Sequence, residues 1–164
     1  MYMRHFLAVV AAFACLAAMG PARAADPAPG ASAPRAKFDP ARDAAADVAA
    51  AVARARAQGK RVIVDVGGEW CTWCHILDRF VASEPDVKKR VDTRFVWVKV
   101  NFSKENKNEA VLGKWPKVAG FPHLFVLDAS GQLLPSQNTG ELESEKTYDK
   151  AKFIAFLDQA AGSK

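Results

Sequence analysis

The chain has 164 residues, of which 50% are hydrophobic and 25% are charged, and its formal net charge is +5. The excess of basic residues is small and spread along the sequence, with no run longer than Lys88-Lys89-Arg90. Such a distribution indicates solvated helix faces. It argues against a nucleic-acid-binding protein, which would gather its basic residues in a patch.

The first 24 residues have the pattern of a secretory signal peptide. A basic start precedes an apolar segment, residues 6–19, that is too short to span a bilayer, and Ala22-Arg23-Ala24 is an A-x-A cleavage site. We therefore expect export into an oxidising compartment, most naturally a bacterial periplasm, and a mature chain that begins at Ala25. An uncleaved membrane anchor, or lipoprotein processing at Cys15, fits this segment less well.

The Ala- and Pro-rich residues 25–38 predict a flexible linker, which leaves residues 39–164, about 125 residues, for one compact domain. The domain is expected to open with a helix that begins at Asp39-Pro40 and ends before Gly59. The spacing of small and apolar residues in this helix predicts a buried stripe of Ala45, Val48, Val52 and Ala55.

A buried strand is predicted next, at residues 61–66, by the β-branched apolar run RVIVDV. After two glycines, Cys71 and Cys74 open a helix expected over residues 72–81. Its apolar face is formed by Ile76, Leu77, Phe80 and Val81. A kink at residues 83–85, which include a proline, separates this helix from a continuation to about residue 92.

The two cysteines are the only ones that remain after signal cleavage, and the loop that they would close is too short to add much stability. A cysteine at a helix N-terminus faces unpaired backbone N–H groups and the positive end of the helix dipole. Both effects favour the thiolate over the thiol. The pair therefore predicts redox chemistry rather than a structural crosslink.

The rest of the domain predicts a small mixed sheet. Residues 95–100 form a second strong strand, and the polar residues 103–114 are only weakly helical, so residues 103–117 have no assigned role. A strand at 124–127 is followed by a turn and by a return strand from Gln132, which Pro135 marks as an edge or a bend. Asp149 caps a last helix with an inward face of Phe153, Ile154, Leu157 and Ala160. The order α-β-α-β-α-β-β-α implies a sheet covered on both faces.

Four separated segments of the domain resemble the thioredoxin family. Residues 64–74, VDVGGEWCTWC, resemble its active-site segment, and Gly120-Phe121-Pro122 resembles its Gly-x-cis-Pro loop. Residues 98–101 resemble its central strand. Gly140 and the segment 153–157 resemble its final glycine and C-terminal helix. The W-C-x-W-C-H version of the motif looks most like exported thioredoxin-like proteins of bacteria.

The resemblance covers roughly residues 40–161 and implies an α/β thioredoxin fold, with a central mixed sheet of about four strands and helices on both faces. It also implies a redox-active disulfide between Cys71 and Cys74, with no further cofactor and no metal. The chain departs from thioredoxin in two places. Thr72-Trp73 replaces Gly-Pro between the cysteines, and Gly67 stands where an aromatic residue is usual. These departures leave the redox potential and the substrate open.

By the same resemblance, Cys71 is an exposed attacking thiolate, and Cys74 is the buried cysteine that resolves a mixed disulfide. Asp65 lies in an otherwise apolar strand, and the family places its equivalent beneath the second cysteine, where it takes the proton from Cys74. Lys99 falls where the family has a buried lysine near this aspartate, although a snorkelling surface lysine fits equally well. His75 either tunes the site or is an ordinary exposed helix residue.

Substrate contacts are expected from the residues around the cysteines and from the loop that packs against them. Pro122 is expected in the cis form, with the backbone of Phe121 free to pair with an extended substrate segment, although ordinary core packing of Phe121 fits equally well. Trp70 and Trp73 would form an apolar platform for such a segment. Thr72 and Trp73, between the cysteines, are expected to be exposed.

Together these features predict a periplasmic thiol-disulfide oxidoreductase that reduces or isomerises disulfides of exported proteins. The reducing direction is favoured because Thr72-Trp73 lacks the histidine that favours the thiolate in strong oxidants. A reductase would need an electron donor, such as a membrane thiol-disulfide interchange protein, and its substrates would be exported proteins or apocytochrome thiols. A disulfide oxidase of the same fold is the first alternative.

Two other classes share the motif. Residues 71–75 spell C-x-x-C-H, the attachment signal of a c-type haem, but all three methionines lie in the signal segment, and the β-rich pattern upstream is wrong for a small cytochrome. A thiol-based metal module could add His75 and His123, at an awkward spacing for a tetrahedral site. A redox-inactive peptide-binding domain is opposed by the joint presence of Asp65, the CxxC pair and Pro122.

Overall fold

The computed structural model describes residues 37–162. The predicted signal peptide, and all but the last two residues of the predicted linker, lie outside the described residues. No helix within residues 37–162 is long and apolar enough to cross a membrane.

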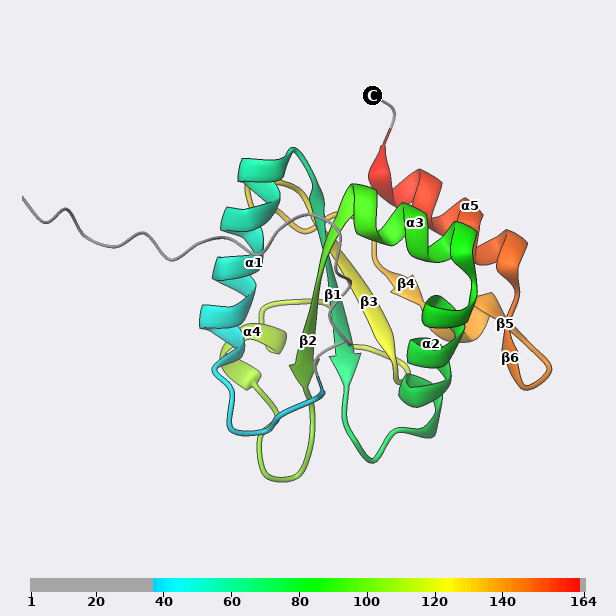
Figure 1. The fold of residues 1–164 in the computed structure, drawn as a ribbon. Coiled ribbons are helices and arrows are strands. Elements are labelled where there is room, and N and C mark those ends of the chain that lie inside the picture. The colour runs from blue at the N-terminus through cyan, green and yellow to red at the C-terminus, as the bar shows by residue number, and fades with distance from the viewer. Residues whose placement is uncertain (1–36, 163–164) are drawn as a thin grey trace, which may run out of the picture. The chain divides into compact units, whose positions relative to one another are not determined.

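Helices and strands alternate along the first half of the chain, and short elements follow before a last helix (Figure 1). In chain order they are α1 (Ala44–Gln58), β1 (Arg61–Gly67), α2 (Thr72–Ser83), α3 (Pro85–Arg94), β2 (Phe95–Asn101), α4 (Glu109–Leu112), β3 (His123–Leu127), β4 (Gln137–Asn138), a 3₁₀ turn (Thr139–Leu142), β5 (Glu143–Ser144), β6 (Thr147–Tyr148) and α5 (Lys150–Ala161). The short β5–β6 hairpin and the 3₁₀ turn have no counterpart in the sequence prediction.

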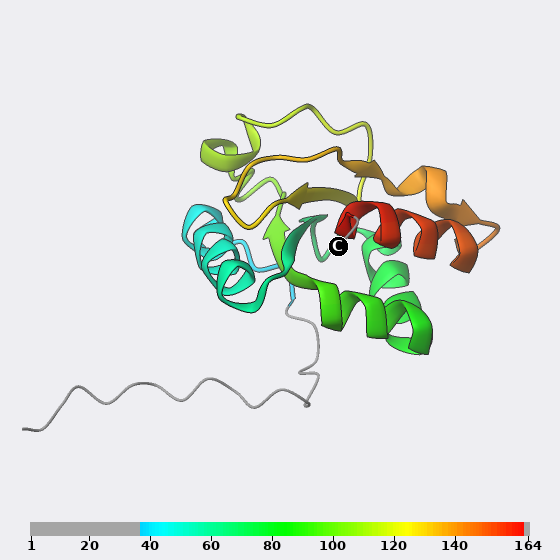
Figure 2. The ribbon, with the colours of Figure 1, turned by 90° about the horizontal axis from the view of Figure 1, so that it is seen from above.

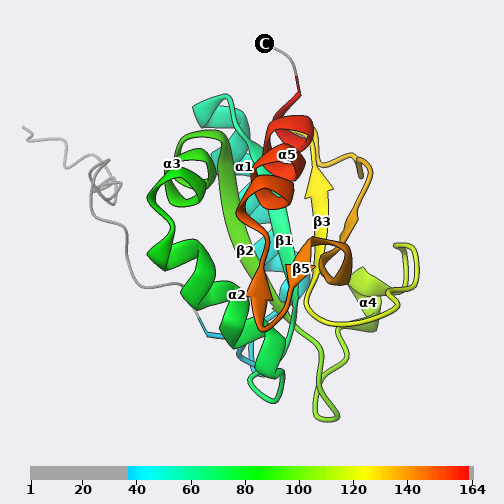
Figure 3. The same cartoon turned by 90° about the vertical axis from the view of Figure 1, so that its right-hand side faces the viewer.

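A four-stranded mixed sheet in the order β2-β1-β3-β4 forms the centre of the fold. β1 runs parallel to β2, with Asp65 opposite Lys99, and antiparallel to β3. α1 and α4 cover one face, and α2, α3 and α5 cover the other (Figures 2 and 3). This is the α/β thioredoxin fold that the sequence predicted, with helices on both faces of a mixed sheet.

The first helix begins later than predicted. Asp43, and not Asp39, is the N-cap of α1, because its carboxylate accepts hydrogen bonds from the N–H groups of Ala45 and Ala46. Asp39 instead accepts from the N–H of Ala41 in a turn ahead of the helix. The buried stripe differs from the prediction at its first position, where Ala44 is buried and Ala45 is exposed. Ala55 is buried as predicted, together with Ala51, and Val48 and Val52 are partly buried beside them.

The return strand also lies further along the chain than Gln132. Leu133 makes only an isolated bridge to Leu127, and β4 pairs with β3 at Gln137 and Asn138. Pro135 falls between these two contacts. Because proline lacks an N–H group, it cannot continue a ladder, and regular pairing resumes only beyond it.

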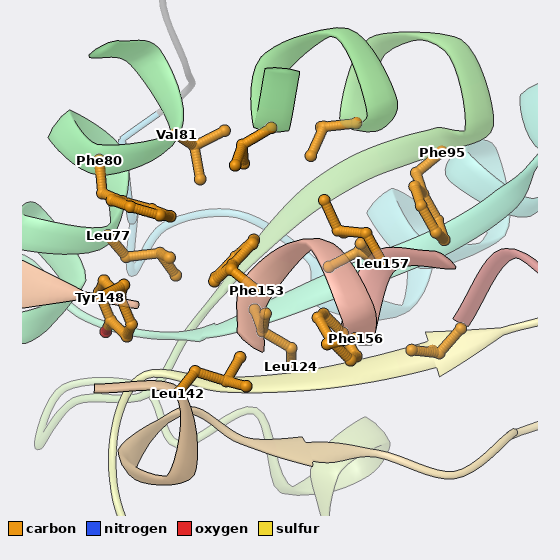
Figure 4. Packing of buried hydrophobic residues seen from close by; sticks show 14 residues of the cluster. Leu77, Phe80, Val81, Phe95, Leu124, Leu142, Tyr148, Phe153, Phe156 and Leu157 are labelled. Carbon is orange, nitrogen blue, oxygen red and sulfur yellow. The ribbon is translucent and has the colours of Figure 1, made fainter. Parts of the chain in front are cut away.

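Aromatic and aliphatic side chains fill the core between the sheet and the helices α2, α3 and α5 (Figure 4). Phe153 of α5 is fully buried and lies edge-to-face against Phe80, Tyr148 and Phe156. Asp149 caps this helix as predicted. Phe153 and Leu157 are buried as predicted, whereas Ile154 and Ala160 are only partly buried. Phe156, which was not predicted on the inward face, is the third buried residue.

Residues 103–117, to which the sequence assigned no role, are held in place partly by hydrogen bonds of asparagine side chains. Asn101 Nδ2 donates to the carbonyl oxygen of Asn106 at 2.9 Å, and Asn108 Nδ2 donates to the carbonyl oxygen of Asn101 at 2.7 Å. Asn108 has a left-handed backbone with φ of 50°, which asparagine tolerates better than most residues. Trp115 then packs on Phe125, so this segment covers one end of the sheet.

We predict that Phe153→Ala lowers the free energy of unfolding by about 3–5 kcal/mol, because it removes a buried ring and leaves a cavity among aromatic neighbours. Urea unfolding of the oxidised protein measures the loss. Lys152→Ala, at the exposed neighbouring position, is the control and should change stability by less than about 0.5 kcal/mol. Equal stability of the two variants would contradict the packing described above.

Candidate active site

Cys71 and Cys74 are joined by a disulfide at the N-terminus of α2. Cys71 is the N-cap residue, and its Sγ accepts a hydrogen bond from the backbone N–H of Cys74 at 3.1 Å. The sulfur of Cys71 therefore lies among the unpaired N–H groups of a helix start, where negative charge is stabilised. This is the placement on which the predicted nucleophile depends.

The expected exposure of Cys71 is wrong for this oxidised form. Cys71 is only 4% exposed and Cys74 is fully buried. Both belong to one buried apolar cluster with Phe38, and Trp73 and Phe121 pack against that cluster. The loop of Phe121 was expected to pack against the cysteines, but Phe38 was not, because it reaches them from a segment that was assigned to the linker.

The turn between β1 and α2 requires glycine at its start. A Cβ atom on Gly67 would lie 2.4 Å from the Cys74 sulfur, closer than any such contact allows. The absence of a side chain at Gly67 therefore lets the end of β1 approach the first turn of α2. The N–H of Cys71 then donates to the carbonyl oxygen of Gly68 at 2.9 Å, which fixes the first cysteine at the helix start.

Three charged groups lie together behind the cysteines. The Lys99 ammonium is 3.3 Å from Asp65 Oδ2 and 2.9 Å from Asp78 Oδ2, and the side chains of Lys99 and Asp65 are 3% and 0% exposed. The indole N–H of Trp97 also donates to Asp65 Oδ2, at 3.3 Å. Lys99 is therefore the buried partner of Asp65, and the alternative of a snorkelling surface lysine is wrong.

Burial raises the pKa of Asp65 above its usual value, because desolvation penalises the carboxylate. The positive charge of Lys99 opposes this rise, the negative charge of Asp78 adds to it, and the hydrogen bond from Trp97 opposes it. The second oxygen of Asp65, Oδ1, has no hydrogen-bond partner among the described residues. Asp65 is thus a buried carboxyl that readily takes up a proton.

Asp78 is the member of this group that the sequence analysis missed. It lies four residues after Cys74, on the same side of α2, and its side chain is 28% exposed. The only sequence feature that could have pointed to Asp78 is a charged residue directly after the buried Leu77, on an otherwise apolar helix face. That signal alone does not separate an inward carboxylate from a solvated one.

An aromatic surface borders the disulfide. Trp70 is 58% exposed, and its ring lies edge-to-face against Phe121, while Phe121 stacks on Phe102 at a centroid distance of 4.9 Å. The indole N–H of Trp70 donates to the carbonyl oxygen of Phe102 at 2.8 Å. Trp70 and Phe102 line a cavity of about 490 Å³, and Phe102 and Phe121 line a second of about 320 Å³. The structure therefore brings Trp70 and Phe121 together as a platform, to which Phe102 is an unpredicted addition.

The peptide bond between Phe121 and Pro122 is cis, the isomer that the resemblance implies. Pro122 is buried, and its carbonyl oxygen accepts a hydrogen bond from Thr139 Oγ1 at 2.6 Å. Thr139 is a second residue that the sequence analysis did not name, and it fixes the proline loop to the 3₁₀ turn after β4.

The other predicted residues divide into exposed and packed ones. Thr72 is exposed as expected, whereas Trp73 is partly buried, because its ring packs edge-to-face on Tyr148. Trp73 therefore belongs to the core side of the site and not to the platform with Trp70. The Nε2 atom of His75 lies 2.9 Å from the carbonyl oxygen of Glu69, on a side chain that is 39% exposed.

His123 points away from the buried charges. His123 pairs with Val66 of β1, which is the residue after Asp65. Because successive residues of a strand point to opposite faces, His123 lies on the other face of the sheet from Asp65, where its ring packs against Phe125. Burial lowers its pKa, with the charge of Glu141 opposing that shift. Within residues 37–162, no group of three or more His, Cys, Asp or Glu side chains is arranged to hold a metal ion.

The sequence and the fold both have known relatives. A family model described as thioredoxin-like matches residues 43–129. The thiol:disulfide interchange protein DsbD of Salmonella paratyphi A is 33% identical over 107 residues, which is 64% of this chain and 18% of that protein. DsbD of Escherichia coli is 31% identical over 91 residues, 54% of this chain and 16% of that protein. The chain thus matches less than a fifth of the length of these relatives.

Two solved structures share the fold. A disulphide isomerase from Xylella fastidiosa superposes with a TM-score of 0.64 at 21% identity, over 76% of this chain and 96% of that one. The C-terminal domain of DsbD from Neisseria meningitidis, in the oxidised form, superposes with a TM-score of 0.57 at 23% identity, over 76% and 99% of the two chains.

We predict that Asp65→Asn stabilises the protein at neutral pH. In the folded wild type, the pKa of Asp65 lies above its value in the unfolded chain, which is about 3.9. The folded protein therefore loses stability as the pH rises from about 3.9 through the raised pKa of Asp65. Asparagine does not ionise, so the Asp65→Asn variant does not lose stability in this way. Lys99 still has Asp78 as its ion-pair partner in the variant. The gain should be absent near pH 4, grow as the pH rises through the raised pKa of Asp65, and be largest near pH 7.

Urea unfolding of the oxidised protein from pH 4 to pH 8 measures this difference. Asp158→Asn, on the surface of α5, is the control and should show a small effect without that pH dependence. An asparagine variant that is less stable than the wild type at pH 7 would show that the ion pair outweighs the desolvation of Asp65.

Proposed function

The chain belongs to the thioredoxin-like family, and we propose that it is a thiol-disulfide oxidoreductase that exchanges the Cys71–Cys74 disulfide with the thiols and disulfides of other proteins. The observation that carries this proposal is the disulfide at the start of α2, where the Cys71 sulfur accepts a hydrogen bond from a helix N–H group. The buried carboxyl of Asp65 lies two residues before Gly67, on the same face of β1, and the Cys74 sulfur packs against Gly67. The disulfide is itself the redox group, and the proposed reaction needs no further cofactor or metal.

In the reducing direction the reaction has two displacements. The Cys71 thiolate attacks one sulfur of a substrate disulfide, so that a Cys71–substrate disulfide forms and the other substrate sulfur leaves as a thiolate that takes up a proton. Cys74, as a thiolate, then attacks the Cys71 sulfur and releases the second substrate sulfur. The substrate has gained two electrons and two protons, and the protein is left in its disulfide form.

The second displacement requires Cys74 to lose its proton. We assign this task to Asp65, because burial raises the pKa of its carboxyl and makes it a better proton acceptor than an ordinary aspartate. Lys99 modulates Asp65 through the direct contact between their charged groups. The same groups return the proton when the reaction runs in the oxidising direction.

The platform of Trp70 and Phe121 gives the substrate its place. Both rings lie beside the cysteines, and the backbone of Phe121 precedes the cis proline, so an extended segment can lie along Phe121 with its apolar side chains on Trp70. Thr72, exposed between the cysteines, borders the same surface. Unfolded or extended segments of exported proteins fit this arrangement.

We further propose that the protein works in the periplasm and reduces or isomerises disulfides of exported proteins. The signal-like segment supports export, and the relatives named DsbD are thiol:disulfide interchange proteins. The dipeptide Thr72-Trp73 lacks a histidine and supports the reducing direction. In that direction the protein needs a source of two electrons, for which a membrane thiol-disulfide interchange protein is the proposed donor.

We predict that Cys71→Ser abolishes insulin disulfide reduction driven by dithiothreitol, because the attacking sulfur is lost. Cys74→Ser should instead accumulate mixed disulfides with the substrate, visible on non-reducing gels. Cys15→Ser is the matched control and should keep wild-type turnover, since that residue lies in the predicted signal segment. Full turnover by either of the first two variants would overturn the roles assigned to the pair.

A redox titration of Cys71 and Cys74 against glutathione tests the direction. We expect a reduction potential near that of thioredoxin, about −270 mV, which suits a reductase. A potential near that of strong oxidants, about −120 mV, would assign the protein to disulfide formation instead.

A further inference from the structure

One buried aromatic ring of the site comes from outside the sheet and helices. Phe38 precedes α1 by six residues, in the segment that the sequence analysis assigned to the flexible linker, and yet it is only 2% exposed. It forms one buried cluster with Cys71 and Cys74. The ordered domain therefore includes Phe38, and the segment around it is part of the site.

Two hydrogen bonds hold this segment to loops on either side of the cysteines. The backbone N–H of Phe38 donates to Glu69 Oε1 at 2.8 Å, just ahead of Cys71. The carbonyl oxygen of Pro40 accepts from Asn106 Nδ2 at 2.9 Å, beyond the end of β2. The ring of Phe38 is thus fixed by contacts that are distant in sequence and that all converge on the active site.

The ring covers two reactive groups at once. Its centroid lies 3.8 Å from the Lys99 ammonium, a cation–π contact on the group that pairs with Asp65 and Asp78. A Cβ atom on Gly67 would lie 3.1 Å from Phe38 Cζ as well as 2.4 Å from the Cys74 sulfur. The ring edge and the sulfur therefore share the space that glycine leaves open at the end of β1.

We propose that Phe38 is a positioning residue that seals the Cys74 sulfur and the Lys99 ammonium from water and from other thiol reagents. This proposal rests on the proposed function, because it concerns the cysteine that resolves the mixed disulfide. With the ring in place, the Cys71 sulfur is the partner that Cys74 can reach. Cys74 is then fully buried, while Cys71 keeps a 4% exposed fraction, so an external disulfide meets the Cys71 sulfur first.

The test measures how fast Cys74 is alkylated by iodoacetamide in the reduced full-length chain with Cys71→Ser, with the modified peptide quantified by mass spectrometry. Adding Phe38→Ala should speed alkylation at least about tenfold, because local opening is no longer needed for access. Phe38→Leu restores an apolar side chain of similar reach, and it should bring the rate back to within about threefold of the parent.

Phe95→Ala is the matched control, since Phe95 is equally buried but begins β2 at the opposite end of the strand from Asn101, which pairs with Gly67. It should leave the Cys74 rate within about threefold of the parent. The proposal is overturned if Phe38→Ala leaves the rate unchanged, if Phe38→Leu is as fast as Phe38→Ala, or if Phe95→Ala speeds alkylation equally.

If circular dichroism shows that Phe38→Ala does not fold, Glu69→Ala decides instead. This change removes the acceptor of the Phe38 N–H and leaves the core side chains intact, so it should speed Cys74 alkylation, and an unchanged rate would contradict the cover. Insulin reduction by the wild type tests the proposed function separately. If the wild type reduces insulin but Phe38→Ala does not change the rate of Cys74 alkylation, the proposed function stands and the proposed role of Phe38 is wrong.

Discussion

The parallel pairing of β1 with β2 sets the geometry of the whole site. Its register places Asp65 opposite Lys99 and ends with Gly67 opposite Asn101. From that end the chain turns directly into α2, so the disulfide sits at the junction of the sheet and a helix start. A shift of one residue would turn Asp65 to the face covered by α1 and α4 and would separate it from Lys99. The buried charges and the disulfide thus depend on one strand pairing.

Burying three charged groups in so small a region has a free-energy cost, and the arrangement limits it. A single ammonium lies between two carboxylates, so each charge has a partner of opposite sign. The side chain of Asp78 reaches partial solvent, while that of Asp65 does not. The complete burial of Asp65 raises the pKa of its carboxyl, because desolvation penalises the charged form. A stability cost therefore accompanies a carboxyl that is suited to proton transfer.

Prediction from sequence succeeded where local pattern decides structure. The β-branched apolar run at residues 61–66, the glycine at the end of α1 and the cap at Asp149 are local signals, and all three were confirmed. It failed where two local signals compete, as with Asp39 and Asp43, both of which can cap a helix. It also failed for short pairings such as β4 and β5–β6, because strands of two residues leave no periodicity to detect.

Residue type and spacing alone indicated the reactive groups: a cysteine pair at a helix start, a carboxylate in an apolar strand, and a proline loop in the right order. The chain carries these properties before it folds. The side chains that cover those groups could be identified only from the folded structure. Phe38, Asp78 and Thr139 join the site from three separate parts of the chain, and the exposure of Cys71 and Trp73 follows from their neighbours. Contacts between residues distant in sequence are set by packing, which no local pattern encodes.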